Sequence, residues 1–188
     1  MTELAASQID EEGFVVVPEA LGPVEIDAIG AAVAELGGRI SASGRGGARR
    51  LFQEALEIRL LAGDPAVRSV AVAALGAACF PVRALLFDKT PAANWKVTWH
   101  QDLTIAVRAR RDVEGYGPWS SKAGIPHVQP PISVLEGGLV VMRPLLLHAS
   151  SPAKSPGHRR VVHIEYAAAE LADGLKWYEA PHQAFTDS

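Results

Sequence analysis

Apolar residues recur at helical spacing over the first half of the chain. A first helix is predicted to begin at Pro23, where a missing N–H is harmless, and to end at Gly37-Gly38. A second is predicted from the N-cap Asp64 to about Gly76. Their apolar positions are Ile26, Ile29, Val33 and Leu36, and then Val67, Val70, Ala71, Ala74 and Leu75. The Gly-, Ser- and Arg-rich stretch 38–50 is predicted to be a loop with solvated arginines.

From Cys79 onward the pattern changes to short runs of β-branched and aromatic residues, which predict strands. The candidate strands are VRALLF, WKVTWH, LTIAV, GLVVM, PLLLHA and RVVHIEY, after an early strand GFVVVP. A long irregular segment, 108–131, is predicted to be a lid or binding loop. The pattern therefore predicts one α+β domain, 1–188, with a mainly helical layer over 1–78 and a β core over 79–188.

Composition narrows the class of protein. A chain of 188 residues with 48% hydrophobic and 21% charged residues suits one globular domain. Its net charge of -3 argues against nucleic-acid binding, and its longest apolar stretch is interrupted by Arg143 and Pro144, short of the ~18 residues of a membrane span. A single Cys79 excludes an internal disulfide, and the acidic N-terminus does not resemble a secretion signal. We therefore expect a cytoplasmic protein.

Candidate metal ligands lie at the end of the strand WKVTWH. Residues two apart in a strand face the same side, so His100 and Asp102 can bind one metal ion. His148 would complete the two-histidine, one-carboxylate set of non-haem Fe(II) oxygenases. The spacing alone is not specific, because six histidines and 21 acidic residues supply about 0.7 such pairs by chance. A second pair indeed exists at His163 and Glu165.

Two arginines stand at the start of the strand RVVHIEY. An arginine entering a core strand is costly to bury unless it meets an anion, and its planar fork fits a carboxylate. Arg159 or Arg160 can therefore hold a dicarboxylic co-substrate. Alternatively, both guanidinium groups stay in water at the mouth of the strand.

Three segments together resemble the phytanoyl-CoA dioxygenase family of Fe(II)- and 2-oxoglutarate-dependent oxygenases. They are LLFDKTPAANWKVTWHQD, GPWSSKAGIPHVQPP and MRPLLLHASSPAKSPGHRRVVHIEY, and the opening GFVVVPEALGPVEIDAI is also similar to that family. The resemblance implies a double-stranded β-helix, a cupin-like jelly roll, with flanking N-terminal helices. It implies Fe(II) ligands at His100, Asp102 and His148, 2-oxoglutarate bound by Arg159 and Ser150, and O2 as the oxidant.

The activity implied by the resemblance is hydroxylation of a small-molecule or acyl substrate, with release of succinate and CO2. Asp102 favours this outcome, because related halogenases carry a small residue in its place. His163 and Glu165 would then lie in the core or behind the metal ligands. Substrate selection is expected in the segment 108–131 and in nearby aromatic residues, which are Trp95, Trp99, Tyr116 and Trp119. The arginines Arg108, Arg110 and Arg111 either receive an anionic substrate or form a solvated face.

The chain departs from the family at one junction, where Glu136 runs directly into Gly137. Family members carry further strands between the segments that match HVQPPISVLE and GGLVVMRP, and a jelly roll without them would expose sheet edges. A deletion, a segment omitted from a longer protein, or strands from a second subunit would each explain this. Two other functions therefore stay open: a catalytically inert jelly-roll remnant that serves as a binding or structural module, and a cupin-like metal enzyme that does not use 2-oxoglutarate. The substrate and the oligomeric state stay open as well.

Overall fold

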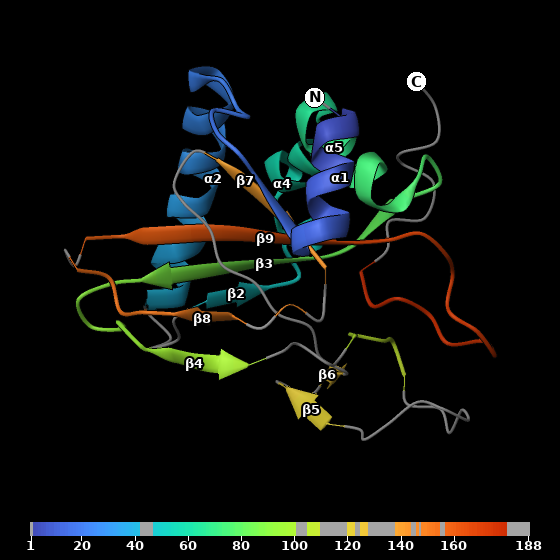
Figure 1. Cartoon of the computed structure of the whole chain (residues 1–188). Coiled ribbons are helices and arrows are strands. Elements are labelled where there is room, and N and C mark those ends of the chain that lie inside the picture. Colours follow the sequence, from blue (N-terminus) through green and yellow to red (C-terminus); the bar gives the residue numbers. More distant parts are fainter. Residues whose placement is uncertain are drawn as a thin grey trace.

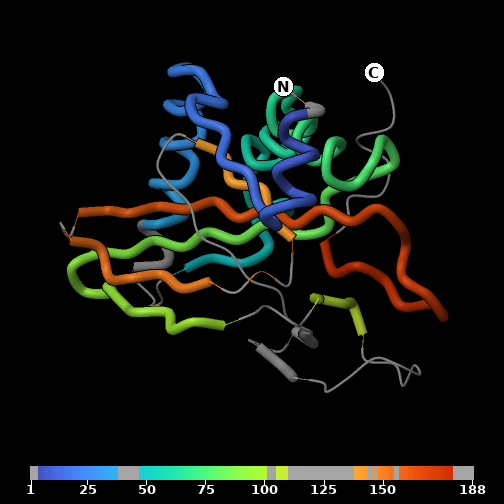
Figure 2. Tube along the Cα trace, in the orientation of Figure 1, coloured from blue at the N-terminus to red at the C-terminus, as the bar shows by residue number. Residues whose placement is uncertain are grey.

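The computed structural model describes residues 2–41, 47–100, 105–109, 120–122, 125–127, 138–143, 146, 148–154 and 157–179. Helices and antiparallel sheets are mixed. The helices gather on one side of the long strands β3 and β9, and the short strands β4 and β8 lie on the other side (Figure 1). The tube in Figure 2 shows that most of this helical layer comes from the first part of the chain, in blue to green.

The helices in the described part of the chain are α1 (Thr2–Glu12), α2 (Pro23–Ser41), α3 (Leu51–Glu54), α4 (Leu56–Gly63) and α5 (Pro65–Leu75). Asp64 caps α5, because its Oδ1 accepts hydrogen bonds from the backbone N–H groups of Ala66 at 2.8 Å and Val67 at 3.4 Å. The start of α2 at Pro23 and both ends of α5 confirm the sequence pattern. The other helices were not predicted from it.

The described strands are β1 (Phe14–Val17), β2 (Gly47–Arg49), β3 (Phe80–Lys89), β4 (Val97–His100), β5 (Ser120–Lys122), β6 (Ile125–His127), β7 (Leu139–Met142), β8 (His148–Ser150) and β9 (Arg159–Ala167). They pair in the orders β1-β7, β2-β3-β9, β4-β8 and β5-β6. All the predicted strands except LTIAV overlap one of these. Within LTIAV, Val107 forms an isolated bridge with Trp177, and residues 103–104 lie outside the description. The junction at Glu136 also lies outside it.

One face of the β2-β3-β9 sheet packs against the helices. Ala84 and Leu86 of β3 are 0% exposed and form a core cluster with residues of α2, α3 and α4. Ala48 of β2 and Val162 and Ile164 of β9 pack against the same cluster. Because side chains alternate along a strand, the residues between them face the opposite side of the sheet. That face carries the polar residues of the site described below.

Two predictions for the stretch 37–50 are wrong. The helix α2 does not end at Gly37-Gly38 but continues to Ser41. Gly37 serves close packing instead, since a Cβ there would lie 3.2 Å from Asp88 Oδ2. The expected loop contains β2, in which Arg49 pairs with Leu85 and is partly buried rather than fully solvated. The sequence pattern misses this strand because three residues carry little periodicity, and pairing with β3 creates it.

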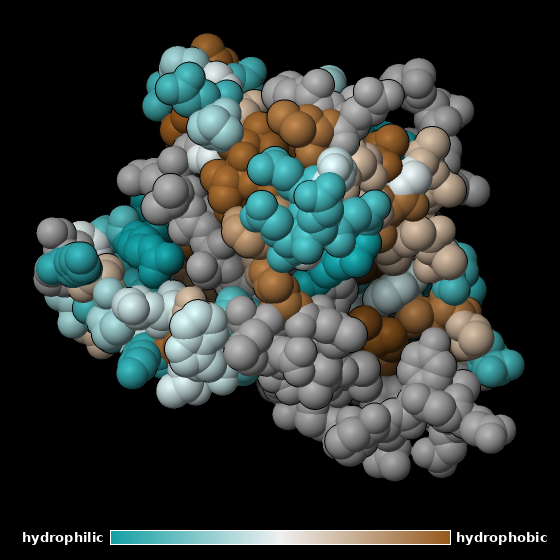
Figure 3. All heavy atoms as spheres, viewed as in Figure 1, coloured by the Kyte–Doolittle hydropathy of each residue, from teal (hydrophilic) through white to brown (hydrophobic). Residues whose placement is uncertain are grey.

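The surface follows the same division between layers. In the space-filling view, brown apolar atoms show among the helices, whereas the end that carries β4 and β8 is pale to teal (Figure 3). Within the described residues, no helix has the length and apolar character needed to cross a membrane.

Candidate functional site

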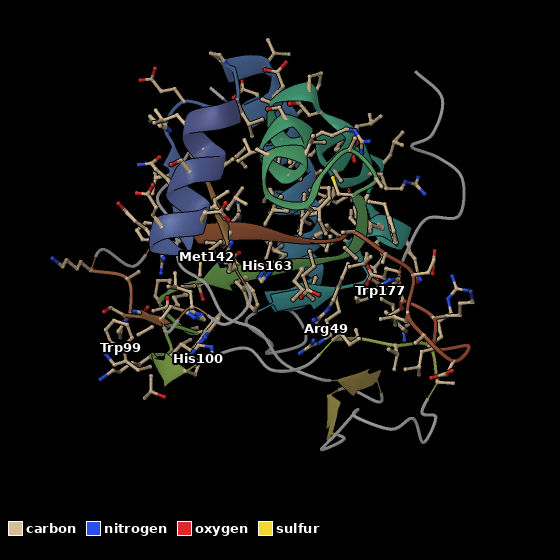
Figure 4. All side chains as sticks on the ribbon, turned by 45° about the vertical axis from the view of Figure 1, so that its right-hand side comes forward. Arg49, Trp99, His100, Met142, His163 and Trp177 are labelled. Carbon is tan, nitrogen blue, oxygen red and sulfur yellow. The ribbon has the colours of Figure 1, made fainter. Side chains whose placement is uncertain are left out.

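His100 and His148 meet across the β4–β8 pair. They are direct partners in the strand register, and their ring centroids are 4.2 Å apart with the planes tilted by 48°. His100 lies beyond the sheet, on the side away from the helices, with Trp99 pointing further outward (Figure 4). The fold therefore brings together two of the three residues that the sequence pattern selects as metal ligands.

The hydrogen bonds of the two rings decide which nitrogen can bind a metal. His100 Nδ1 lies 2.8 Å from the carbonyl oxygen of Thr98, and His148 Nδ1 lies 3.4 Å from that of Leu146. A carbonyl oxygen only accepts hydrogen bonds, so each Nδ1 carries a proton, and the lone pair of each ring is on Nε2. An imidazole held by its Nδ1–H in this way is typical of histidines that bind metals through Nε2.

Burial keeps His148 in the neutral form that a metal requires. The side chain is buried, and desolvation lowers its pKa to about 4. Positive charge on His100 or His163 lowers the pKa further, whereas the hydrogen bond to the Leu146 carbonyl oxygen opposes the shift. At neutral pH the ring is therefore uncharged and can act as a ligand without first losing a proton.

The third predicted ligand, Asp102, lies outside the described residues. Among the residues that the structure does describe, no three His, Cys, Asp or Glu side chains gather into a group that could hold a metal ion. Two facing imidazoles are the nitrogen donors that a two-histidine, one-carboxylate iron site needs, and their chemistry fits Fe(II). A carboxylate two residues after His100 stays the predicted complement.

A cationic cluster lies next to the two histidines. Arg159 Nη1 lies 3.3 Å from Ser150 Oγ, so the two residues expected to hold a dicarboxylate are in contact. Lys89 Nζ donates to the same hydroxyl at 2.8 Å, and also to the carbonyl oxygens of Ser150 at 3.4 Å and Ser151 at 2.7 Å. Lys89 and Arg159 are direct cross-strand partners on β3 and β9. Two positive charges therefore converge on one serine.

This arrangement leaves the Ser150 hydroxyl with a proton to donate. Lysine and arginine only donate hydrogen bonds, so Ser150 Oγ accepts from both of them. Its own O–H then requires an acceptor, and beside two cations the favoured acceptor is an anion. The cluster of Lys89, Ser150 and Arg159, hereafter the cationic cluster, thus has the chemistry of a carboxylate-binding site.

Lys89 is a site residue that the sequence analysis missed. The side chain is only 4% exposed, and burial, with the charge of Arg159 as the second cause, lowers its pKa. It also lies 5.5 Å from the centroid of the Trp95 ring, in a cation–π contact. A lysine at the end of the apolar run VRALLF was the available signal, because a lysine in a core strand is rarely buried without a partner.

The second His-x-Glu pair, His163 and Glu165, lies on the same face of the β2-β3-β9 sheet as Lys89 and Arg159. His163 Nε2 is 4.0 Å from Glu165 Oε1, but Glu165 Oε1 also accepts a hydrogen bond from Arg83 Nη1 at 2.8 Å. Burial lowers the pKa of His163, and Glu165 opposes this shift. The glutamate is thus engaged by an arginine on the neighbouring strand. This contact supports a structural role for the pair rather than a primary metal site.

The predicted substrate-selecting residues are only partly described. Trp99 is 71% exposed, and Trp95 contacts Lys89. Arg108 is exposed and donates its backbone N–H to the Lys176 carbonyl oxygen. The remaining ones, Arg110, Arg111, Tyr116 and Trp119, lie outside the described residues. Their role in substrate selection stays a prediction.

Solved structures with a similar fold include enzymes that use iron and alpha-ketoglutarate. The non-heme alpha-ketoglutarate-dependent carbocyclase SnoK from nogalamycin biosynthesis has a TM-score of 0.66 at 18% identity, over 98% of this chain and 89% of SnoK. The epimerase SnoN, solved with Fe3+, alpha-ketoglutarate and nogalamycin RO, has a TM-score of 0.64 at 17% identity, over 88% and 82% of the two chains. AviO1 from Streptomyces viridochromogenes Tue57 has a TM-score of 0.61 at 22% identity, over 89% and 95%.

These similarities establish the fold. No protein-family model matches the chain, and no curated protein sequence is similar to it. The resemblance to the phytanoyl-CoA dioxygenase family therefore rests on its motifs, whereas the likeness to non-heme iron enzymes of the SnoK and SnoN type rests on three-dimensional structure.

Proposed function

We propose that this protein is an Fe(II)- and 2-oxoglutarate-dependent dioxygenase that hydroxylates a small-molecule or acyl substrate and releases succinate and CO2. One observation carries the proposal: His148 and Ser150 are two residues apart on β8 and face the same side of the strand. Their backbone positions are therefore roughly 6–7 Å apart. A five-carbon dicarboxylate has the length to chelate a metal at His148 and to place its far carboxylate at Ser150.

The residues divide the binding between them. His100 and His148 would hold Fe(II) through Nε2, with Asp102 as the predicted third ligand, and bound iron would supply the activation of dioxygen. Arg159 and Ser150 would receive the far carboxylate of 2-oxoglutarate through charge-assisted hydrogen bonds. Lys89 holds Ser150 in place and adds positive potential at the same point. Fixing the co-substrate at both ends sets the orientation of its reacting end.

We interpret the β2-β3-β9 and β4-β8 sheets as opposing walls of a jelly roll. The polar face of the first sheet and the facing histidines of the second support this interpretation. The similarity to SnoK and SnoN supports it as well. These neighbours catalyse a carbocyclisation and an epimerisation, so a rearranged product is the second outcome to look for beside a hydroxylated one.

The test is succinate release from 2-oxoglutarate by the folded protein in the presence of Fe(II). We expect Asp102→Ala and His148→Ala to abolish it together with iron binding, because each removes a ligand. Arg159→Gln should keep iron binding and raise the KM for 2-oxoglutarate about 10- to 100-fold, which is the effect of losing a charged hydrogen bond.

Each competing function gives a different result. A folded wild type that neither binds iron nor turns over 2-oxoglutarate would indicate a catalytically inert binding or structural module. A metal-dependent activity that is indifferent to Arg159→Gln would instead indicate a cupin-like metal enzyme that does not use 2-oxoglutarate. Mass analysis of the product distinguishes hydroxylation, which adds one oxygen atom, from epimerisation, which adds none.

A further inference from the structure

A buried carboxylate lies behind the cationic cluster, on the helix-covered face of the sheet. Asp88 immediately precedes Lys89 on β3 and is 2% exposed. Its Oδ2 accepts a hydrogen bond from His158 Nδ1 at 2.8 Å and another from Arg160 Nε at 3.4 Å. His158 and Arg160 are the two neighbours of Arg159 in the chain. Asp88 therefore binds the residue before and the residue after Arg159, the arginine that contacts Ser150.

The strand register explains why such a hold is needed. Lys89 and Arg159 form the last cross-strand pair of β3 and β9, and like charges directly opposite each other weaken a sheet. The preceding pair, Asp88 with Arg160, has opposite charges and lies on the other face. Attraction at the back of the sheet therefore opposes repulsion at the front. We expect that without this attraction the ends of the two strands would separate, which would move Arg159 away from Ser150.

Stability alone does not account for Asp88. The backbone of α2 at Gly37 comes so close that a Cβ there would lie 3.2 Å from Asp88 Oδ2. Asp88 Oδ1 is buried and has no hydrogen-bond partner among the residues that the structure describes. A buried carboxylate oxygen without a partner destabilises the fold, and a buried ion pair as a whole is often no more stable than well-packed apolar residues of similar volume. A role in positioning its neighbours explains why a carboxylate stands here.

We propose that Asp88 is a positioning residue for co-substrate binding. From the helix-covered face of the sheet, Asp88 binds His158 and Arg160 and thereby positions Arg159 between them. It positions Lys89 through the backbone, because the two residues are neighbours in the chain. The inference rests on the proposed function, because the ligand class it assigns to the cationic cluster is the far carboxylate of a dicarboxylate. Asp88 does not touch that ligand, since it lies on the opposite face of the sheet.

The test compares two ligands that differ at the far end. Calorimetric titrations of the Fe(II)-loaded protein without oxygen would use 2-oxoglutarate and oxalate, which chelates a metal but has no distant carboxylate. We expect Asp88→Asn to raise the Kd for 2-oxoglutarate about tenfold and to leave the Kd for oxalate unchanged. In steady-state assays, KM for 2-oxoglutarate should rise by a similar factor while kcat stays within about twofold.

Matched variants separate positioning from loss of stability. Val162→Ala removes two methyl groups from the same face of the sheet, on β9, so it should lower stability and leave the Kd for 2-oxoglutarate unchanged. His158→Gln keeps Asp88 and replaces a half-exposed side chain, so this variant should fold and raise that Kd about threefold. Arg160→Gln combined with Asp88→Asn should weaken binding by less than the product of the single effects, because both act through one contact.

Two results would overturn the inference. One is an Asp88→Asn protein that binds 2-oxoglutarate as tightly as the wild type; the other is an equal loss of 2-oxoglutarate and oxalate binding. Failure of the proposed function is distinguishable, because Arg159→Gln would then leave the Kd for 2-oxoglutarate unchanged. In that case the dicarboxylate role of the cationic cluster and of Asp88 would both be wrong.

Discussion

The two faces of the β2-β3-β9 sheet are made by alternate residues of the same strands, yet they differ in kind. The helix-covered face is largely apolar, with Ala84 and Leu86 at 0% exposure. The opposite face carries Lys89 and Arg159, and also the polar residues Arg83, His163 and Glu165. Asp88 and Arg160 are the charged exceptions on the helix-covered side, and they lie directly behind the Lys89–Arg159 pair.

The comparison separates stability from function within one sheet. Burial of apolar side chains under the helices stabilises the fold, whereas a buried lysine opposite an arginine costs stability and is favourable when an anion binds. Natural proteins depart from the rules of stable packing mainly at functional sites. The polar face is therefore the place to test for binding, and the apolar face is the place to test for stability.

The largest expected effect is on the apolar face. Leu86→Ala should lower the free energy of unfolding by about 2–5 kcal/mol, because it leaves a cavity in the core. Its neighbour Phe87 points to the opposite face and is 38% exposed, so Phe87→Ala should lower the free energy of unfolding by clearly less than Leu86→Ala. Urea unfolding of both variants checks this. Equal losses would contradict the assignment of the two faces.

A binding effect on the polar face should come next in size. With Fe(II) present and oxygen excluded, 2-oxoglutarate at a hundred times its Kd should stabilise the wild type by about 2.7 kcal/mol. At the same ligand concentration, Arg159→Gln should show much less stabilisation, whereas Val162→Ala should keep all of it. Thermal unfolding with and without the ligand measures both. A full ligand effect in Arg159→Gln would show that the anion binds elsewhere.

A third effect should depend on pH. His148 has a pKa of about 4 in the folded protein against the ordinary value of 6.5, so below 6.5 the unfolded chain takes up the proton first. In metal-free protein, the contribution of His148 to the free energy of unfolding should be full above about pH 6.5 and fall as the pH drops toward 4. Denaturant unfolding of the wild type and of His148→Gln across this pH range measures the contribution of His148. Parallel pH curves for the two proteins would show that His148 is not held neutral by burial.

Local signals in the sequence predicted much of the fold. The cap at Asp64, the proline at 23 and the apolar runs of β4, β7 and β9 act through neighbouring residues, and those elements formed as expected except at the end of α2. The predicted end of α2 at Gly37 was wrong, because a glycine can either end a helix or allow close packing. Only the position of Asp88 distinguishes the two. The strand β2, which contains Arg49, was not predicted because its partner is almost 40 residues further along the chain, in β3.

Some residues of the candidate site were likewise predicted from the sequence, and others were not. Residue types and spacing singled out His100 and His148, the family resemblance added Arg159 and Ser150, and the fold brings each pair into contact. Lys89 and Asp88 were not singled out, because neither belongs to a motif, although a lysine after the apolar run VRALLF is a local signal. Their roles arise from the register of β3 against β9, which places Lys89 opposite Arg159 and Asp88 opposite Arg160.

Which residues alternate between the two faces of each strand can be read from the sequence, because a strand has a fixed side-chain period. Which charges meet across the strands depends on how the strands pair in the folded protein. A shift of the β3–β9 register by one residue would leave every local propensity unchanged and would place Lys89 on the other face, opposite different partners. The cationic cluster and the carboxylate behind it are therefore properties of the pairing, which is fixed by packing against the helices over the whole sheet.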